Sequence, residues 1–587
     1  MVRSKRIAAQ VAGMEEPIKK RLKRDEEGTN EDLETLQRSL LDQCLCLMPE
    51  SVLIKPFQGI KVLRQEDTRG YSTSYIADWN RDRTLLFVSS VQLLCEVAIK
   101  QNARGLVCSR IGDVCDALVR NEHGLVDHLI ELSGHSDRFV CFSAGRALSA
   151  FFLASRAHVD PRWLDRLTDN ALSTNNPQKM SFSLEVIKRV VEWKDCEEHP
   201  LEERSGDDRP PASCHVLSVS DPDSLDSSQI KCLCIKALEA KWPSVVSRFD
   251  RLLQNESTAV TFLGLWEAII SVKANLSVVD TKPFYAYLDR FVMLLHSRVS
   301  PIIWKHLLDL FNEVLCYGST LALQDLLAEE PCSLAHLVVR SVKDSRLLDA
   351  LPYRGGSGSF GGGYGDGDRP LLQKVVLLVL KSVAVTVKET RCESSSDSSL
   401  GSENEDEDED MAVIERSIHE VLRQLDNCVK TLLPFHPETP VAQWVVQLFA
   451  DQDDALVEGM VCCLDVSVGL LQRPNSSAEL RRALSPALSF AQFLRTVSHD
   501  PDVLLDLLVS NETCFLLYLL RLLKYVRRNW IEFVSSCSGE LDDIMSVFIR
   551  LRLAIDRLVA RALFPYNINP VLRLLEKCEQ MYEGNAG

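Results

Sequence analysis

The sequence lacks a long uncharged apolar run, and its N-terminus lacks an apolar segment. A membrane-spanning helix needs about 18 to 20 such residues. The two most apolar runs, LLQKVVLLVLKSVAVTV and CFLLYLLRLLKYV, are interrupted by Lys or Arg at helical spacing. The first residues, MVRSKRIAAQ, contain neither the apolar core nor the cleavage site of a secretory signal. These absences predict a soluble intracellular protein that makes no membrane contact.

Strand-like alternation is almost absent, and the cysteines are scattered. Only the run SVLIKPFQGIKVL at 51–63 allows an extended piece, and Pro56 argues against a central strand there. The 19 cysteines occur mostly within apolar helical runs, whereas a disulfide-built secreted domain is short and dense in cysteine. We therefore expect reduced, buried thiols and little β-structure.

The motifs of metal, nucleotide and nucleophilic sites are also missing. The densest set of Cys and His, between 108 and 141, contains no pair at C-x2-C or H-x3-H spacing. Cys44 and Cys46, like Cys232 and Cys234, are two residues apart, which on a helix points them to different faces. The Gly-rich run has no Lys-Ser/Thr after it, and no G-x-S-x-G elbow occurs. We therefore predict no catalytic, cofactor or metal residue, no enzyme activity and no small-molecule substrate.

The sequence is rich in apolar residues at helical spacing. Three stripes each follow one helix face. They are Val140, Ala144, Ala147, Leu148 and Phe151; Trp304, Leu307, Leu308, Phe311 and Leu315; and Ile418, Val421, Leu422, Leu425, Val429 and Leu432. Asp160-Pro161, Ser300-Pro301 and Asp500-Pro501 each put a side-chain acceptor at the N-cap and Pro at the first helical position. The predicted fold is all-α, an irregular armadillo/HEAT-like helical superhelix, because no strict repeat period is visible.

Changes in composition divide the chain into eight predicted segments. They are a disordered basic tail at 1–30, an N-terminal helical region at 31–195, a linker at 196–228, a central helical region at 229–351, a Gly-rich loop at 352–369, a buried helix at 370–389, an acidic Ser-rich loop at 390–412 and a C-terminal helical region at 413–583. Gly-rich and Ser-rich runs are typical of flexible connections. The helix between them is apolar around most of its circumference, so we expect it in the core.

A basic motif near the N-terminus has the layout of a two-part nuclear import signal. Its residues are Lys5 and Arg6, then, after twelve residues, Lys19, Lys20, Arg21, Lys23 and Arg24. Import receptors offer acidic pockets and tryptophan faces to successive cations of an extended peptide. The alternative is a solvated tail. The motif predicts binding to a nuclear import receptor and a protein found in both nucleus and cytoplasm.

Two late helical runs carry basic stripes in a chain of formal net charge −17. One stripe is Arg521, Lys524 and Arg528; the other is Arg550, Arg557 and Arg561. Either these are solvated faces with cations favourably placed against the helix dipoles, or they form a docking surface for an acidic segment. No direct DNA binding is expected, because the overall field opposes it.

An acidic run, Glu403–Asp410, is one candidate for that segment; a partner's acidic segment is the other. Ser396, Ser399 and Ser402 precede the run and are candidate phosphorylation sites for acid-directed kinases. The alternative is that the run only keeps a loop soluble.

Four segments resemble the Lines family of proteins. The two specific ones are DVLLDLLVSNETCFLLYLLRLLKYVRRNW at 502–530 and LFPYNINPVLRLLEKCE at 563–579; the others are SDRFVCFSAGRALSAFF at 136–152 and WVVQLFADQDDALVEGMVCCL at 444–464. The resemblance implies a non-enzymatic segment-polarity regulator that modulates transcription through transcription regulators in Wnt/Wingless-dependent development. The alternative is a structural or trafficking helical solenoid whose basic tail binds acidic lipid or RNA.

Replacing Lys19, Lys20, Arg21, Lys23 and Arg24 by Ala is expected to shift the protein towards the cytoplasm. The melting temperature is expected to stay the same, because a tail that buries nothing does not contribute to stability. Imaging of the tagged chain and a thermal melt measure the two effects. An unchanged nuclear signal would contradict the import hypothesis.

Overall fold

The computed structural model describes residues 30–585, apart from gaps at 50–52, 54–56, 58–75, 121–123, 174–175, 196–213, 219–225, 250–252, 273–281, 298, 345, 354–367, 397–404, 472–477, 511 and 538. The chain divides into two compact units, unit 1 at Met1–Phe284 and unit 2 at Tyr285–Gly587. The predicted import signal and two of the candidate phosphorylation sites, Ser399 and Ser402, lie outside the described residues, as does most of the Gly-rich loop.

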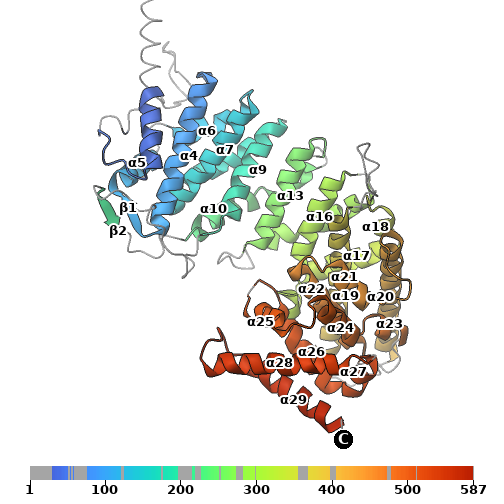
Figure 1. The fold of residues 1–587 in the computed structure, drawn as a ribbon. Coiled ribbons are helices and arrows are strands. Elements are labelled where there is room, and N and C mark those ends of the chain that lie inside the picture. The colour runs from blue at the N-terminus through green and yellow to red at the C-terminus, as the bar shows by residue number, and fades with distance from the viewer. Residues whose placement is uncertain are drawn as a thin grey trace, which may run out of the picture. The chain divides into compact units, whose positions relative to one another are not determined.

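Unit 1 is a row of packed helices. Its first described helix, which we call the first helix, runs through residues 30–41. The later elements are η1 Ile76–Asp78, α4 Arg81–Ala103, β1 Leu106–Cys108, α5 Ser109–Val119, α6 Leu125–Glu131, η2 Leu132–Gly134, α7 Arg138–Ser155, η3 Arg156–His158, α8 Pro161–Ser173, α9 Pro177–Glu192, β2 Val216–Ser218, α10 Ser228–Glu239, α11 Trp242–Ser247 and α13 Glu256–Ser271. Helices α4, α7, α9 and α13 lie side by side in that order (Figure 1). Their facing apolar stripes form the core of this unit.

Within the described residues, the strands β1 and β2 form one two-stranded antiparallel sheet. In it, Val107 of β1 lies opposite Leu217 of β2. The expectation of little β-structure is confirmed, but β2 corrects the predicted linker at 196–228. Strands of three residues are too short to show an alternating pattern, so periodicity does not reveal them. The extended piece allowed at 51–63 is not seen: Leu53 and Phe57 are helical, and the rest of that run lies outside the described residues.

Unit 2 is built around helix α19. Its elements are α15 Leu288–Val292, η7 Met293–His296, α16 Pro301–Val314, η8 Leu321–Leu323, α17 Glu329–Lys343, α18 Arg346–Asp349, α19 Arg369–Ser396, α20 Glu405–Leu432, α21 Val441–Leu448, α22 Asp453–Leu471, α23 Ala478–Ala483, α24 Pro486–Thr496, α25 Pro501–Val509, α26 Phe515–Arg528, α27 Trp530–Ser536, α28 Leu541–Ala560 and α29 Asn569–Asn585. The short helix η6, Lys282–Tyr285, crosses the boundary between the units. Helices α16, α17, α20 and α22 pack against α19, and α26 packs against α22.

Helix α19 owes its central place to its composition. By length and composition, Arg81–Ala103 of α4 and Arg369–Arg391 of α19 are each apolar enough to cross a membrane. The apolar window of α19 is 83% buried inside the structure, and that of α4 is 61% buried. Burial among other helices therefore accounts for the apolar run of α19, which forms the core of unit 2.

The predicted apolar stripes and helix starts are confirmed. All residues of the three stripes are buried except Leu432, which is half-buried. The Ser300 side chain accepts a hydrogen bond from the Ile303 amide at 3.4 Å. The carboxylates of Asp160 and Asp500 each accept one from the amide two residues later. The all-α fold follows directly from these local signals.

The acidic Ser-rich loop predicted at 390–412 is shorter in the structure. Helix α19 continues to Ser396, a candidate phosphorylation site, and α20 already begins at Glu405. Acidic side chains are favourable in the first turn of a helix, because they face the positive end of its dipole. The acidic run therefore suits a helix N-terminus as well as a loop, which composition alone does not distinguish.

Gly469 of α22 marks a close approach between α22 and α19. A Cβ at this buried position would overlap the Val387 side chain of α19. We expect Gly469→Ala to lower the free energy of unfolding by about 1 kcal/mol. Overpacking costs about 1–3 kcal/mol, and the gain of about 1 kcal/mol in helix propensity offsets only part of a cost in the middle of that range.

Gly459, in the same helix, supplies the matched control. A Cβ there meets Val445 Cγ1 at 3.4 Å, an ordinary contact. Gly459→Ala is therefore expected to be neutral or stabilising in urea unfolding. Equal urea midpoints for the two variants would show that α19 and α22 can shift apart to accept the added methyl group at little cost.

Candidate functional site, a basic cleft in unit 2

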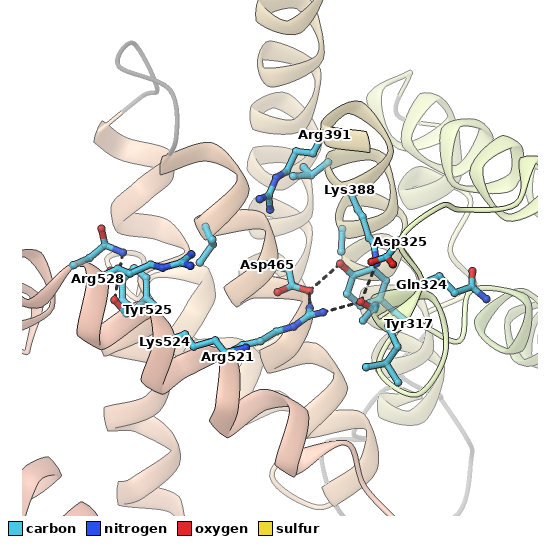
Figure 2. A pocket seen from close by; sticks show the side chains of 16 residues that line it. Tyr317, Gln324, Asp325, Lys388, Arg391, Asp465, Arg521, Lys524, Tyr525 and Arg528 are labelled. Atoms are coloured by element: carbon cyan, nitrogen blue, oxygen red, sulfur yellow. Dashed lines mark hydrogen bonds and ion pairs between the residues drawn. The ribbon is translucent and has the colours of Figure 1, made fainter. Parts of the chain in front are cut away.

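Unit 2 contains a cleft of about 660 Å³ among its described residues. It lies between α19, α22, α26 and the segment 317–325, and we call it the basic cleft (Figure 2). Its charged lining residues are Lys388, Arg391, Arg521, Lys524, Arg528, Asp325 and Asp465. Five cations therefore face two carboxylates in a chain whose formal net charge is −17. The cleft is a local reversal of the protein's overall charge.

A largely buried ion pair joins α19 and α22, two of the helices that line the cleft. Lys381 of α19, only 5% exposed, contacts the Glu458 carboxylate of α22 at 2.8 Å. Lys381 also donates a hydrogen bond to the Asn312 carbonyl at 3.0 Å. The other Glu458 oxygen accepts hydrogen bonds from the amides of Tyr317 and Gly318, each at 2.9 Å. This one carboxylate thus joins α19, α22 and the segment that forms one wall of the cleft.

A second carboxylate, Asp465, is 17% exposed and lies two helical turns further along α22. The Tyr317 hydroxyl donates to it at 2.9 Å, and Arg521 of α26 forms an ion pair with it. Burial raises the pKa of Asp465, and the Arg521 charge opposes that rise. Burial also raises the pKa of Tyr317 well above its usual range. Tyr317 therefore keeps its proton and acts as a hydrogen-bond donor.

Two cations of the cleft also hold backbone carbonyls in its wall. Arg521 Nη2 donates to the Ala322 carbonyl at 2.7 Å. Lys388 Nζ donates to the carbonyls of Leu321 and Ala322, each at 2.8 Å. These bonds fix the turn at 321–323 between α19 and α26. Arg521 and Lys388 therefore have a structural task.

The remaining cations, Arg391, Lys524 and Arg528, are exposed. They approach the cleft from α19 and α26 (Figure 2). Within the described residues, no acidic side chain forms an ion pair with Lys524 or Arg528. Leu323, 62% exposed, adds an apolar patch to the lining. Such a surface suits an anionic group, which guanidinium and ammonium donors bind strongly.

The structure separates the two basic stripes predicted from the sequence. Arg521, Lys524 and Arg528 all line the cleft. Arg550 and Arg557 of α28, and Arg561 directly after it, are not among the lining residues. Arg550 donates to the His499 carbonyl at 2.8 Å. The α26 stripe is therefore part of a concave site, whereas the α28 stripe lies elsewhere.

Sequence reasoning missed the contribution of α19. Lys388 lies near the end of the helix predicted to be buried, 370–389, and Arg391 follows it. Lys381 precedes Lys388 by two helical turns. Positions 381, 388 and 391 fall on one face of a helix. This spacing was a readable signal for a basic stripe on α19. The sequence does predict the basic stripe on α26. That the stripes on α19 and α26 line the same cleft depends on tertiary packing.

Comparisons with known proteins agree on one family. The family description "Lines N-terminus" matches residues 215–537, and "Lines C-terminus" matches 544–580. Protein lines of Drosophila melanogaster is 41% identical, and the match covers 94% of this chain and 80% of that protein. Protein Lines homolog 1 of Homo sapiens is 26% identical over 47% of this chain and 39% of that protein. The basic cleft lies wholly inside the first family match.

Among solved structures, the match with an engineered protein covers 85% of this chain and 95% of that protein. Its TM-score is 0.33 and its sequence identity is 14%. A likeness of that size carries no argument about fold or function.

Lys381→Met is expected to lower the free energy of unfolding by about 3–5 kcal/mol, because it leaves the Glu458 charge buried without a partner. Urea unfolding measures the loss. The double variant Lys381→Met/Glu458→Gln should recover most of it, since the side-chain amide introduced at position 458 carries no charge and its oxygen still accepts the two backbone amides.

Arg423→Met is the control for this pair. Arg423 and Glu420 form an ion pair on the surface of α20, with side-chain exposures of 55% and 33%. Its removal should leave the urea midpoint almost unchanged, because solvent screens exposed ion pairs. Equal losses for Lys381→Met and Arg423→Met would show that the buried pair is not an anchor.

Proposed function

This chain belongs to the Lines family, and on that basis we propose that it is a non-enzymatic regulator that acts by binding other proteins. The partners we propose are transcription regulators in Wnt/Wingless-dependent development, together with a nuclear import receptor for the basic tail. The protein then acts in both nucleus and cytoplasm. The basic cleft of unit 2 is the proposed docking site for an acidic segment of the regulatory partner.

The charge of the cleft is the observation that carries this proposal. Lys524 and Arg528 face the cleft from α26, and Arg391 faces it from α19. A cation-lined concavity in an otherwise acidic protein concentrates the electrostatic field, which attracts an anionic segment and orients it. Leu323 offers an apolar contact beside the cations, so a peptide with mixed acidic and apolar residues suits the cleft.

An acidic protein segment suits the cleft better than a nucleic acid. A duplex presents phosphates along an extended surface, so the net charge of −17 would repel the parts outside the cleft. A short acidic peptide places its charges only where the cations are. The proposal therefore commits to a peptide, and the chain's own acidic run, at the start of α20, is an internal competitor.

The charge reversal Lys524→Glu/Arg528→Glu tests the cleft directly. The probe is a synthetic peptide of residues 402–411, SENEDEDEDM, and fluorescence anisotropy of the labelled peptide measures its affinity. We expect binding to weaken about tenfold at low salt, equivalent to about 1.4 kcal/mol. The difference should shrink as salt rises, because added ions screen exposed charges.

Arg521 is left unchanged in this variant. A glutamate at that position would face Asp465 in a half-buried site and destabilise the wall of the cleft. The matched control is Arg557→Glu/Arg561→Glu, which makes the same charge change at the end of α28, outside the cleft. Equal weakening by both variants would mean that net charge, and not the cleft, controls binding.

A further inference from the structure

Four cysteines that are far apart in the sequence converge in unit 1. They are Cys44, Cys46, Cys108 and Cys214. Their four sulfur atoms all lie within 4.8 Å of one another. Cys46 Sγ is 3.7 Å from Cys108 Sγ and 3.8 Å from Cys214 Sγ. We propose that these four thiolates bind one structural zinc ion.

The sulfur spacing agrees with tetrahedral coordination. A Zn–S bond of about 2.3 Å in a tetrahedron puts the sulfurs about 3.8 Å apart, which matches the separations of Cys46 Sγ from Cys108 Sγ and Cys214 Sγ. A disulfide needs sulfurs about 2.05 Å apart, so the described geometry is that of four separate thiols. Thiolate is a soft ligand that selects zinc over magnesium and calcium, which prefer oxygen.

The local backbone explains how these residues meet. The first helix of unit 1 ends at residue 41, so Cys44 and Cys46 lie beyond it, in the turns that follow. This corrects the prediction that a helix points them to different faces. Cys108 is the last residue of β1, and Cys214 stands two residues before β2. Antiparallel pairing of the strands, with Cys108 opposite Val216, brings these two cysteines to the same end of the ribbon.

Backbone amides surround the sulfurs as they do in thiolate metal sites. The Cys46 amide donates to Cys44 Sγ at 3.4 Å, and the His215 amide donates to Cys46 Sγ at 3.4 Å. Such hydrogen bonds stabilise sulfur that carries negative charge. Cys46 and Cys214 are half-buried, so the cluster lies near the surface, where an ion can enter.

The set has the character of a structural site. Four protein ligands fill a tetrahedron and leave no open position for a substrate or a water molecule. A ribbon of two three-residue strands is too small to be stable alone. An ion held by Cys108, Cys214 and the 44–46 segment would join the ribbon to the first helix. The zinc site therefore supplies local stability and is independent of the basic cleft.

Zinc content and thiol protection test the site in the full-length chain. Protein purified without chelator should contain about one zinc per chain by elemental analysis. Native alkylation with mass spectrometry should leave Cys46 and Cys214 unmodified until a zinc chelator is added. Cys232 is half-buried in α10 and outside the cluster, so its alkylation should not depend on the chelator.

Variants give an independent readout. Cys46→Ser/Cys214→Ser should reduce the bound zinc at least tenfold, whereas Cys232→Ser should keep it. Cobalt(II) added to the metal-free wild-type chain should give the sulfur-to-metal absorption of tetrathiolate coordination, which remains informative if the double variant fails to fold. Disulfides among the four cysteines, iron in place of zinc, or alkylation that ignores the chelator would each overturn the proposal.

Discussion

The basic cleft depends on one buried ion pair, that of Lys381 and Glu458. Glu458 offers one carboxylate oxygen to Lys381 and the other to the amides of Tyr317 and Gly318. Those bonds place the Tyr317 hydroxyl against Asp465, and Asp465 in turn binds Arg521. Each buried charge has a partner, which offsets the several kcal/mol that an isolated charge costs. The wall of the cleft is therefore positioned from the interior outwards.

The cations of the cleft fall into two groups, those that hold its wall in place and those that are exposed to a ligand. Arg521 and Lys388 hold the carbonyls of the 321–323 turn, whereas Lys524 and Arg528 are exposed at the cleft. Because these bonds already hold the wall of the cleft in place, it needs no rearrangement when a ligand arrives, which lowers the entropy cost of binding. One set of charges thus shapes the site, and the other set is available to bind a ligand.

The sequence predicted the features that depend on local periodicity. Helical spacing identified the buried stripes, the capped helix starts, and the common face of Arg521, Lys524 and Arg528. It did not predict that Arg391, on another helix, reaches the same cleft, because this depends on packing between distant segments. The cysteine cluster was missed for a related reason. The helical pattern before Cys44 suggests that the C-x-C pair at 44–46 is helical, but the helix ends at residue 41. Strands of three residues also carry no readable alternation.

The position of α19 in the chain has a consequence for biosynthesis. A ribosome makes two of its neighbours, α16 and α17, before α19, but α22 is complete only at residue 471, which is 75 residues after α19 ends. Synthesis proceeds at about 5–20 residues per second, so the face of α19 that packs against α22 stays exposed for on the order of 4–15 s. Lys381 belongs to that face, since its partner Glu458 lies in α22. During this interval the lysine interrupts an otherwise apolar surface, as a gatekeeper charge does in an aggregation-prone segment.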